Sequence, residues 1–154
     1  MRLYLVQHGK AETKQNDPQR RLTADGRAET DKIAGFLKPV QLGVAQIWHS
    51  GKSRARETAE ILNRAVPADD GLIEREGLSP DSPAEPIRET IATLQGDLMI
   101  VAHLPFLSKL CSVLLLGQKD ADPVDFRNAG IVCLERDACN MWRLRWIVTP
   151  ELLP

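Results

Sequence analysis

The sequence lacks paired cysteines, which argues against a disulfide-stabilised protein. Its three cysteines are Cys111, Cys133 and Cys139, an odd number without a CxxC pair, and Cys111 falls within an apolar helical pattern. A chain of 154 residues buries most of its unfolded surface without disulfides or a structural metal. We therefore expect reduced thiols in a cytoplasmic protein.

The sequence also lacks an excess of charge and a long apolar run. Its 20 Lys and Arg residues balance 21 Asp and Glu residues, for a net charge of −1, so we expect no broad attraction to nucleic acid or to an anionic membrane. No stretch approaches the ~20 apolar residues that span a bilayer, and the run over residues 3–6 is too short for a signal peptide. The expectation is a monomer with no nucleic-acid or membrane partner, in which any recognition of an anion is local.

What the sequence does contain is an alternation of apolar runs and helical patterns. Residues 3–6, 45–48 and 98–102 are predicted strands. The first of them does not alternate between apolar and polar residues, which indicates burial on both faces. Residues 130–134 and 141–148 are two further predicted strands, joined by a hairpin loop.

Four helices are predicted between these strands. Thr23 is a candidate N-cap for the first helix, and Pro39 ends it. Apolar residues recur at helical spacing over residues 55–62. The stretch SPAE at residues 82–85 is typical of a capping box with proline at the first helical position, and the fourth helix begins at Pro105.

Strands and helices that alternate in this way imply a mostly parallel sheet covered by helices on both faces, with an antiparallel element near the C-terminus. The chain shows no internal repeat, no low-complexity segment and no domain linker. The predicted fold is a single-domain, three-layer α/β/α architecture with a mostly parallel central sheet.

All three histidines, His8, His49 and His103, come directly after predicted strands. In an open parallel sheet, ligands bind beyond the carboxyl ends of the strands. Two interpretations compete at this point. The histidines form a three-imidazole zinc site, or some of them transfer protons and phosphoryl groups.

The residues around the histidines favour an anion over a metal ion. The flanking cations are Lys10, Arg20, Arg21, Lys52, Arg54 and Arg56. Positive charge repels a divalent metal and attracts an anionic substrate. The loop-to-helix step at residues 50–54 presents free backbone N–H groups, and Arg54 adds a two-pronged donor for phosphate oxygens. An ordinary solvated basic face accounts for Arg54 equally well.

Three motifs, in order along the chain, resemble those of the histidine phosphatase (phosphoglycerate mutase-like) superfamily. They are Gln7-His8-Gly9, SGKSRARETA at residues 50–59 and His103-Leu104-Pro105. RLTADG at residues 21–26 and LSP at residues 78–80 are most similar to the SixA-type phosphohistidine phosphatase branch. The resemblance runs from Arg2 to about Gly117. It implies a phosphoglycerate mutase-like fold, with one histidine phosphatase domain over residues 1–154.

The resemblance also implies a reaction. His8 is the nucleophile and forms a phosphohistidine enzyme intermediate, Arg54 binds the non-bridging oxygens, and His103 donates a hydrogen bond to the equatorial oxygens. Neither a metal ion nor a cofactor is implied. The substrate is phosphohistidine in a protein or a small phosphoester. The predicted catalytic residues are therefore His8, His103 and Arg54, and the predicted phosphate-binding residues are Gln7, Gly9, Arg54 and Arg21.

Two departures from the family pattern bear on activity. Gln7 stands where the family has arginine, and Gly51 stands where proline is usual. Loss of a charged donor at the transition state costs roughly 2–4 kcal/mol by analogy with an oxyanion donor. The alternative functions are a weak or inactive phosphate- or phosphoprotein-binding relative that has lost Arg at position 7, and a metallohydrolase that uses the three histidines.

The general acid is not identified by the pattern. Larger members of the superfamily take a glutamate from an inserted segment, and this chain has little room for one. The acidic residues in the corresponding part of the chain are Glu74, Glu76, Asp81 and Glu85. An imidazole leaving group has a pKa near neutrality and therefore needs a protein acid less than an alkyl phosphate does.

Overall fold

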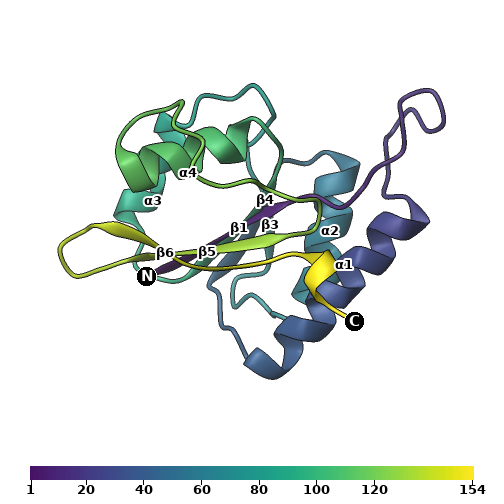
Figure 1. Cartoon of the computed structure of the whole chain (residues 1–154), viewed down its shortest axis with the longest axis horizontal. Coiled ribbons are helices and arrows are strands. Elements are labelled where there is room, and N and C mark those ends of the chain that lie inside the picture. The colour runs from purple at the N-terminus through teal and green to yellow at the C-terminus, as the bar shows by residue number, and fades with distance from the viewer.

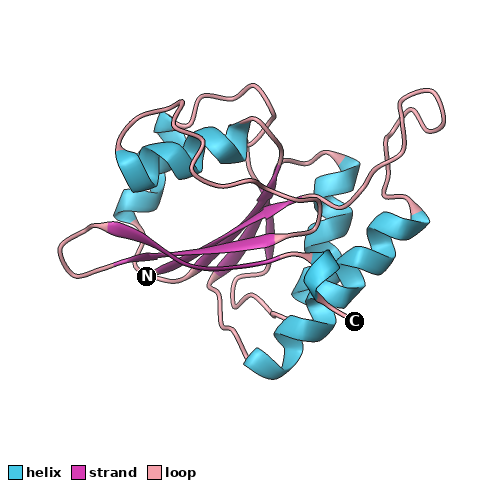
Figure 2. Cartoon of the chain, viewed as in Figure 1, coloured by secondary structure: helices cyan, strands magenta, loops and turns pink.

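The computed structural model describes all 154 residues, as a twisted six-stranded sheet with helices on both faces (Figures 1 and 2). The strands are β1 (Arg2–Gln7), β2 (Gln46–His49), β3 (Leu72–Glu74), β4 (Leu98–Ala102), β5 (Ile131–Arg136) and β6 (Trp142–Val148). Their order across the sheet is β3-β2-β4-β1-β5-β6. The first four in that order are parallel, and β5 and β6 are antiparallel to their neighbours. The predicted architecture, mostly parallel with an antiparallel element at the end of the chain, is confirmed.

Two pairs of helices cover the two faces of the sheet. The helices are α1 (Ala24–Leu37), α2 (Ser53–Asn63), α3 (Glu85–Thr93) and α4 (Phe106–Leu116), with 3₁₀ turns at Lys38–Val40 and Pro150–Leu152. In Figure 1, α3 and α4 lie at the upper left of the sheet, and α1 and α2 lie at the lower right. Each pair encloses its own buried apolar cluster against the sheet.

Strand β1 contributes to both clusters, as its unbroken apolar run predicts. Leu3 and Leu5 pack with α3 and α4, whereas Tyr4 and Val6 pack with α1 and α2. All four side chains are buried. Successive residues of a strand point to opposite faces, so a strand covered on both sides has no polar positions.

Helix α1 begins and ends where the sequence predicts. The Thr23 hydroxyl accepts a hydrogen bond from the Gly26 amide at 2.9 Å, which satisfies one free donor of the first turn. At the other end, Pro39 stands in the 3₁₀ turn that follows Leu37.

The predicted capping box at Ser82 is wrong. Helix α3 begins at Glu85 after Ala84, and no side chain caps it. The Ser82 hydroxyl instead accepts a hydrogen bond from the Ser79 amide at 3.1 Å, within a turn that precedes the helix. A serine hydroxyl can accept a backbone N–H hydrogen bond either in a turn or at a helix start. Here the Ser82 hydroxyl accepts one in the turn. Strand β3, only three residues long, was not predicted.

The sheet brings the ends of three strands to one edge. Gln7 of β1 pairs with Ala102 of β4, and His49 of β2 pairs with Val101 of β4. His8 and His103 therefore follow directly on neighbouring strands. In Figure 1 these ends point toward the upper right, where the loop between β1 and α1 projects. None of the helices combines the length and the apolar composition that a bilayer-spanning segment requires.

Candidate active site

The ring of His8 is held in one tautomer. Its Nδ1 lies 2.7 Å from the Gly9 carbonyl oxygen. Because a carbonyl only accepts, Nδ1 carries the proton and Nε2 keeps its lone pair. The Nε–H of Arg54 donates to that lone pair at 3.3 Å. Nε2 is therefore the nucleophilic atom of the ring, and it lies beside a guanidinium group that binds anions.

The backbone around His8 is anchored from a distant part of the chain. The Asn128 side-chain amide donates to the His8 carbonyl at 2.8 Å, and the Ala129 amide donates to the Gln7 carbonyl at 2.9 Å. The His8 amide donates to the Ala102 carbonyl at 3.1 Å. No sequence motif points to Asn128, because its partner is 120 residues away.

Gly9 is a glycine because helix α1 passes close to it. A Cβ atom here would lie 2.8 Å from the Thr30 hydroxyl and 2.9 Å from the Gly26 carbonyl. The Gly9 amide donates to the Thr58 hydroxyl at 3.0 Å, and its carbonyl accepts from His8. The structure thus explains the missing side chain by packing against α1. The predicted contact of Gly9 with phosphate stays a prediction.

His103 lies next to His8, with ring centroids 5.0 Å apart. Its Nε2 is 2.6 Å from the Ser50 hydroxyl, and its buried Nδ1 has no hydrogen-bond partner. Ser50 thereby joins the site, as a residue that orients His103. Ser50 belongs to the second sequence motif. Its contact with His103 forms because β2 and β4 are neighbours in the sheet.

Both histidines are neutral at physiological pH. Burial lowers the pKa of His8 to about 4, and the charges of Arg54 and Arg20 act in the same direction, against the hydrogen bond to Gly9. Burial also lowers the pKa of His103 to about 3, helped by His8 and the nearby cations. A neutral imidazole has an unprotonated nitrogen that can act as a nucleophile, and the environment keeps His8 in this form.

The structure brings Arg54 to the histidines and leaves Arg21 elsewhere. Arg54 lies in the first turn of α2. Its pKa is lowered mainly by burial and, to a smaller extent, by repulsion from Arg20. Arg21 is exposed and forms an ion pair with Asp17 at 2.9 Å. Arg20 is the loop arginine that faces Arg54. The sequence includes Arg20 among the flanking cations but does not distinguish it from its neighbour.

Gln7 stands at the end of β1, directly before His8. Its side-chain oxygen Oε1 is buried without a hydrogen-bond partner. An unpaired buried carbonyl oxygen costs stability. Gln7 therefore stands beside His8 with a side-chain oxygen that makes no hydrogen bond.

His49 does not join the other two histidines. Its Nδ1 accepts a hydrogen bond from the Gly51 amide at 3.1 Å, which fixes the loop into α2. No group of three or more His, Cys, Asp or Glu side chains is arranged to hold a metal ion. The three-histidine zinc arrangement is therefore not present in the fold.

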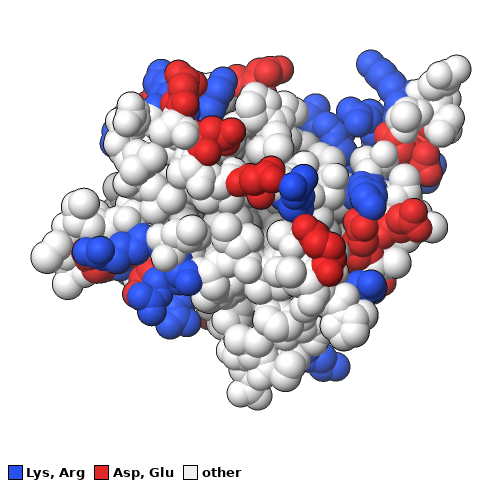
Figure 3. Space-filling model, in the orientation of Figure 1, with Lys and Arg blue, Asp and Glu red and all other residues white.

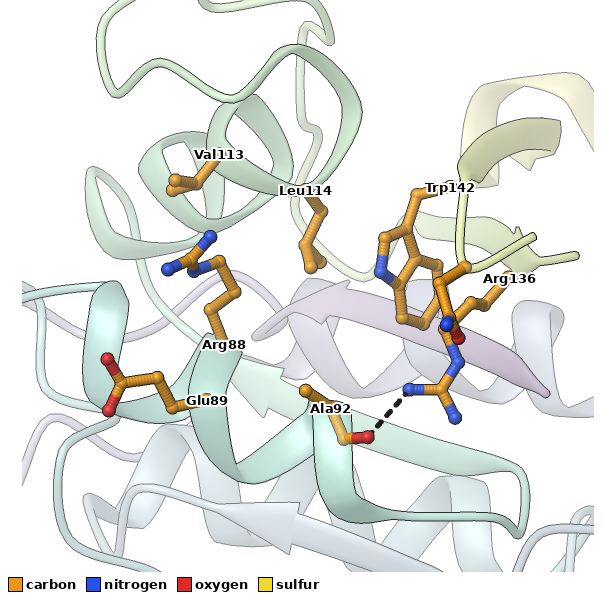
Figure 4. A pocket seen from close by; sticks show the side chains of 8 residues that line it. Arg88, Glu89, Ala92, Val113, Leu114, Arg136 and Trp142 are labelled. Atoms are coloured by element: carbon orange, nitrogen blue, oxygen red, sulfur yellow. Dashed lines mark hydrogen bonds between the residues drawn. The ribbon is translucent and has the colours of Figure 1, made fainter.

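A separate hollow of about 460 Å³ lies at the opposite end of the sheet, among α3, α4 and the β5–β6 hairpin (Figure 4). Arg136, the last residue of β5, donates there to the carbonyls of Ala92 at 3.1 Å and Leu94 at 2.6 Å. Trp142 lies beside its guanidinium group. This arginine closes the C-terminal end of α3, and the hollow contains none of the histidines.

The family model of the histidine phosphatase superfamily (branch 1) matches residues 3–79, half of the chain. The chain belongs to this superfamily, as the resemblance of its motifs predicts. No curated protein sequence matches it significantly.

Solved structures share the fold over almost the whole chain. The protein histidine phosphatase SixA complexed with tungstate is 21% identical, with 99% of each chain covered and a TM-score of 0.87. A structure from Agrobacterium tumefaciens assigned as phosphohistidine phosphatase SixA is 24% identical, with 97% of each chain covered and a TM-score of 0.78. The α-ribazole phosphatase from Shigella flexneri is 17% identical, with 97% of each chain covered and a TM-score of 0.74. At these identities the likeness establishes the fold, and the predicted phosphoglycerate mutase-like architecture is confirmed.

Proposed function

We propose that this protein is a metal-independent phosphatase that transfers a phosphoryl group first to His8 and then to water. The observation that carries the proposal is the unprotonated Nε2 of a neutral His8, which accepts a hydrogen bond from the Arg54 guanidinium at 3.3 Å. Membership of the histidine phosphatase superfamily supports it. In this proposal residues 1–154 act as one histidine phosphatase domain and as a monomer.

The first step forms the covalent intermediate. Nε2 of His8 attacks phosphorus, the bond from phosphorus to the leaving atom breaks, and the leaving atom takes a proton from a solvent water molecule. The ring becomes positively charged as it is phosphorylated, and the Nδ1–H bond to the Gly9 carbonyl stabilises that charge. Arg54 binds the non-bridging oxygens, and a ring N–H of His103 donates to the equatorial oxygens.

The second step restores the enzyme. A water molecule attacks the phosphorus of phosphorylated His8, the bond from phosphorus to Nε2 breaks, and inorganic phosphate leaves. The electron pair returns to Nε2, while Nδ1 keeps its proton and its contact with Gly9. Gln7 supplies a neutral amide donor where the family has a charged one. The contact of Gly9 with phosphate remains part of the same proposal, whereas Arg21, which pairs with Asp17 away from Arg54, is left out of it.

The proposed substrate is phosphohistidine in a protein, or a small phosphoester. The similarity in fold to the protein histidine phosphatase SixA favours phosphohistidine. The similarity in fold to an α-ribazole phosphatase supports a small phosphoester. Glu85 pairs with Lys119 at 3.0 Å, and Glu74 packs against Gly51. An imidazole leaving group requires no strong protein acid, so phosphohistidine makes the smaller demand on these residues.

The test is turnover of p-nitrophenyl phosphate and of a phosphohistidine peptide in the presence of EDTA, for the wild type and His8→Ala. We expect EDTA-resistant turnover that His8→Ala abolishes. Labelling with a radioactive phosphoryl group should give an acid-labile, alkali-stable modification in the wild type alone. His49→Gln is the matched control, because it alters a strand-end histidine outside the cluster and keeps an acceptor for Gly51.

Other outcomes identify the alternatives. Loss of turnover with EDTA would indicate a metallohydrolase. Binding of phosphate or vanadate without turnover would indicate a phosphate- or phosphoprotein-binding relative.

A further inference from the structure

A basic pocket of about 400 Å³ opens beside His8, between the loop that follows β1 and the start of α2. Lys14, Arg20, Lys52 and Arg54 line it, and no hydrophobic residue does. Figure 3 shows Lys and Arg side chains gathered at the upper right of the molecule, over that loop and that end of α2. On a chain with a net charge of −1, this concentration of positive charge is local.

None of the four cations has a carboxylate partner. Neighbouring cations do: Lys10 pairs with Glu29, Arg21 with Asp17, and Arg27 with Glu57. The pKa of Arg54 is lowered first by burial and then by repulsion from Arg20. Four like charges around one solvent-filled pocket are unfavourable unless an anion neutralises them.

Arg20 is held toward the pocket by the backbone. Its φ of 49° is in the left-handed region, which costs an L-residue roughly 1–2 kcal/mol, and its Nε–H donates to the Glu12 carbonyl at 3.1 Å. This conformation separates Arg20 from Arg21, which turns to Asp17.

The pocket is next to the reacting atom but does not contain it. Arg54 lines the pocket and also bonds to Nε2 of His8, whereas His8 and His103 do not line it. The first turn of α2 has no side-chain cap, so its backbone donors are available to an anion in this place. An anion in the pocket would be a neighbour of the phosphoryl group on His8.

We propose that the basic pocket is a subsite for a second anionic group of the substrate, a carboxylate or a phosphate carried close to the phosphoryl group that His8 accepts. The proposal rests on the proposed phosphatase function and specifies its substrate as one with at least two anionic groups. Acidic side chains beside a phosphohistidine and a small bis-anionic phosphoester both have this chemistry.

The test compares substrates that differ by one charge. The pairs are phenyl phosphate with 4-carboxyphenyl phosphate, and phosphohistidine peptides flanked by Gln with the same peptides flanked by Glu. We expect the wild type to have a kcat/KM about fivefold higher for the more anionic member of at least one pair. That ratio should fall toward one in Arg20→Gln and as salt is added. The pair that shows the preference identifies the source of the second anion.

A matched control removes the same charge outside the pocket. Arg56→Gln, on the exposed side of α2 near Glu60, should keep the wild-type ratio. A wild-type ratio of one in both pairs would overturn the subsite and leave the phosphatase standing. If Arg20→Gln lowered kcat/KM equally within each pair, Arg20 would instead bind the transferred phosphoryl group, and the proposal would also fail.

The subsite is testable apart from turnover. Calorimetry would compare binding of inorganic phosphate with that of pyrophosphate, which carries two linked anionic groups. Tighter binding of pyrophosphate that Arg20→Gln removes, in a protein without turnover, would keep the subsite and reject the phosphatase. Equal binding of the two anions by the wild type would count against the subsite.

Discussion

His8 meets three requirements of a nucleophilic imidazole through separate contacts. The Gly9 carbonyl sets the tautomer, burial keeps the ring neutral, and Arg54 lies beside the reactive nitrogen. Each contact is made by a different segment: the loop after β1, the surrounding core and helix α2. The three contacts are coupled, because the Gly9 hydrogen bond raises the pKa of His8 and the charge of Arg54 lowers it.

Gln7 is the residue at which this site departs from the family pattern. We predict that Gln7→Arg raises kcat/KM for phosphorylated substrates about tenfold or more, because a charged, two-pronged donor is stronger than an amide at a transition state. The buried Oε1 of Gln7, which has no partner, gives up no hydrogen bond in the exchange. Steady-state kinetics measure the effect.

Gln118→Arg is the control for this prediction, since it adds the same charge at an exposed position after α4. An unchanged or lower kcat/KM in Gln7→Arg would mean that the site has been rebuilt around glutamine.

Among the elements, α1 positions the segment after His8 by direct contact. A Cβ atom on Gly26 would lie 2.1 Å from the Lys10 carbonyl oxygen, and the Thr23 amide donates to that same carbonyl at 3.0 Å. The loop from Gly9 to Lys10 therefore rests on the first turn of the helix. The position of His8 depends on how closely the two backbones approach.

We predict opposite effects for two alanine substitutions in α1. Gly26→Ala should lower the free energy of unfolding by about 1–3 kcal/mol through overpacking and should reduce turnover, because Lys10 and the neighbouring loop must move. Gly35→Ala has no atom within 4 Å of its new Cβ and should stabilise the helix by up to about 1 kcal/mol. Urea denaturation and steady-state kinetics on both variants test this prediction. Equal changes in the free energy of unfolding for the two variants would contradict the close approach of Gly26 to the Lys10 carbonyl.

At the scale of the whole molecule, buried neutral histidines make stability depend on pH. The folded protein protonates His8 only near pH 4 and His103 only near pH 3, whereas an unfolded histidine protonates near 6.5. As the pH falls below about 6.5, the unfolded chain binds more protons. The free energy of unfolding should therefore decrease, by at most about 1.4 kcal/mol per pH unit for each histidine.

Urea denaturation between about pH 7 and about pH 5 measures this slope, above the range in which most carboxylates titrate. The double variant His8→Asn, His103→Asn should flatten it, with a smaller slope left from His49, whose pKa burial also lowers. A free energy of unfolding that rose or stayed constant as the pH fell would contradict the prediction.

The sequence by itself determined the fold class, the main strands and the three motifs that carry the candidate site. Apolar runs and helical periodicity are local properties, so they predict strands and helices before packing is known. The motifs around His8, Arg54 and His103 pointed to one edge of the sheet because parallel strands share the direction of their carboxyl ends. Strand β3 escaped prediction because three residues carry too little pattern.

Only the tertiary structure decided which side chains meet. Ser50 and His103 are 53 residues apart, and Asn128 is 120 residues from His8, so no local pattern relates them. Arg20 and Arg21 are neighbours in sequence, yet a left-handed backbone at Arg20 and the ion pair to Asp17 send them to different places. Contacts of this kind depend on chain direction and on competing partners, which are settled when the sheet and its loops pack together.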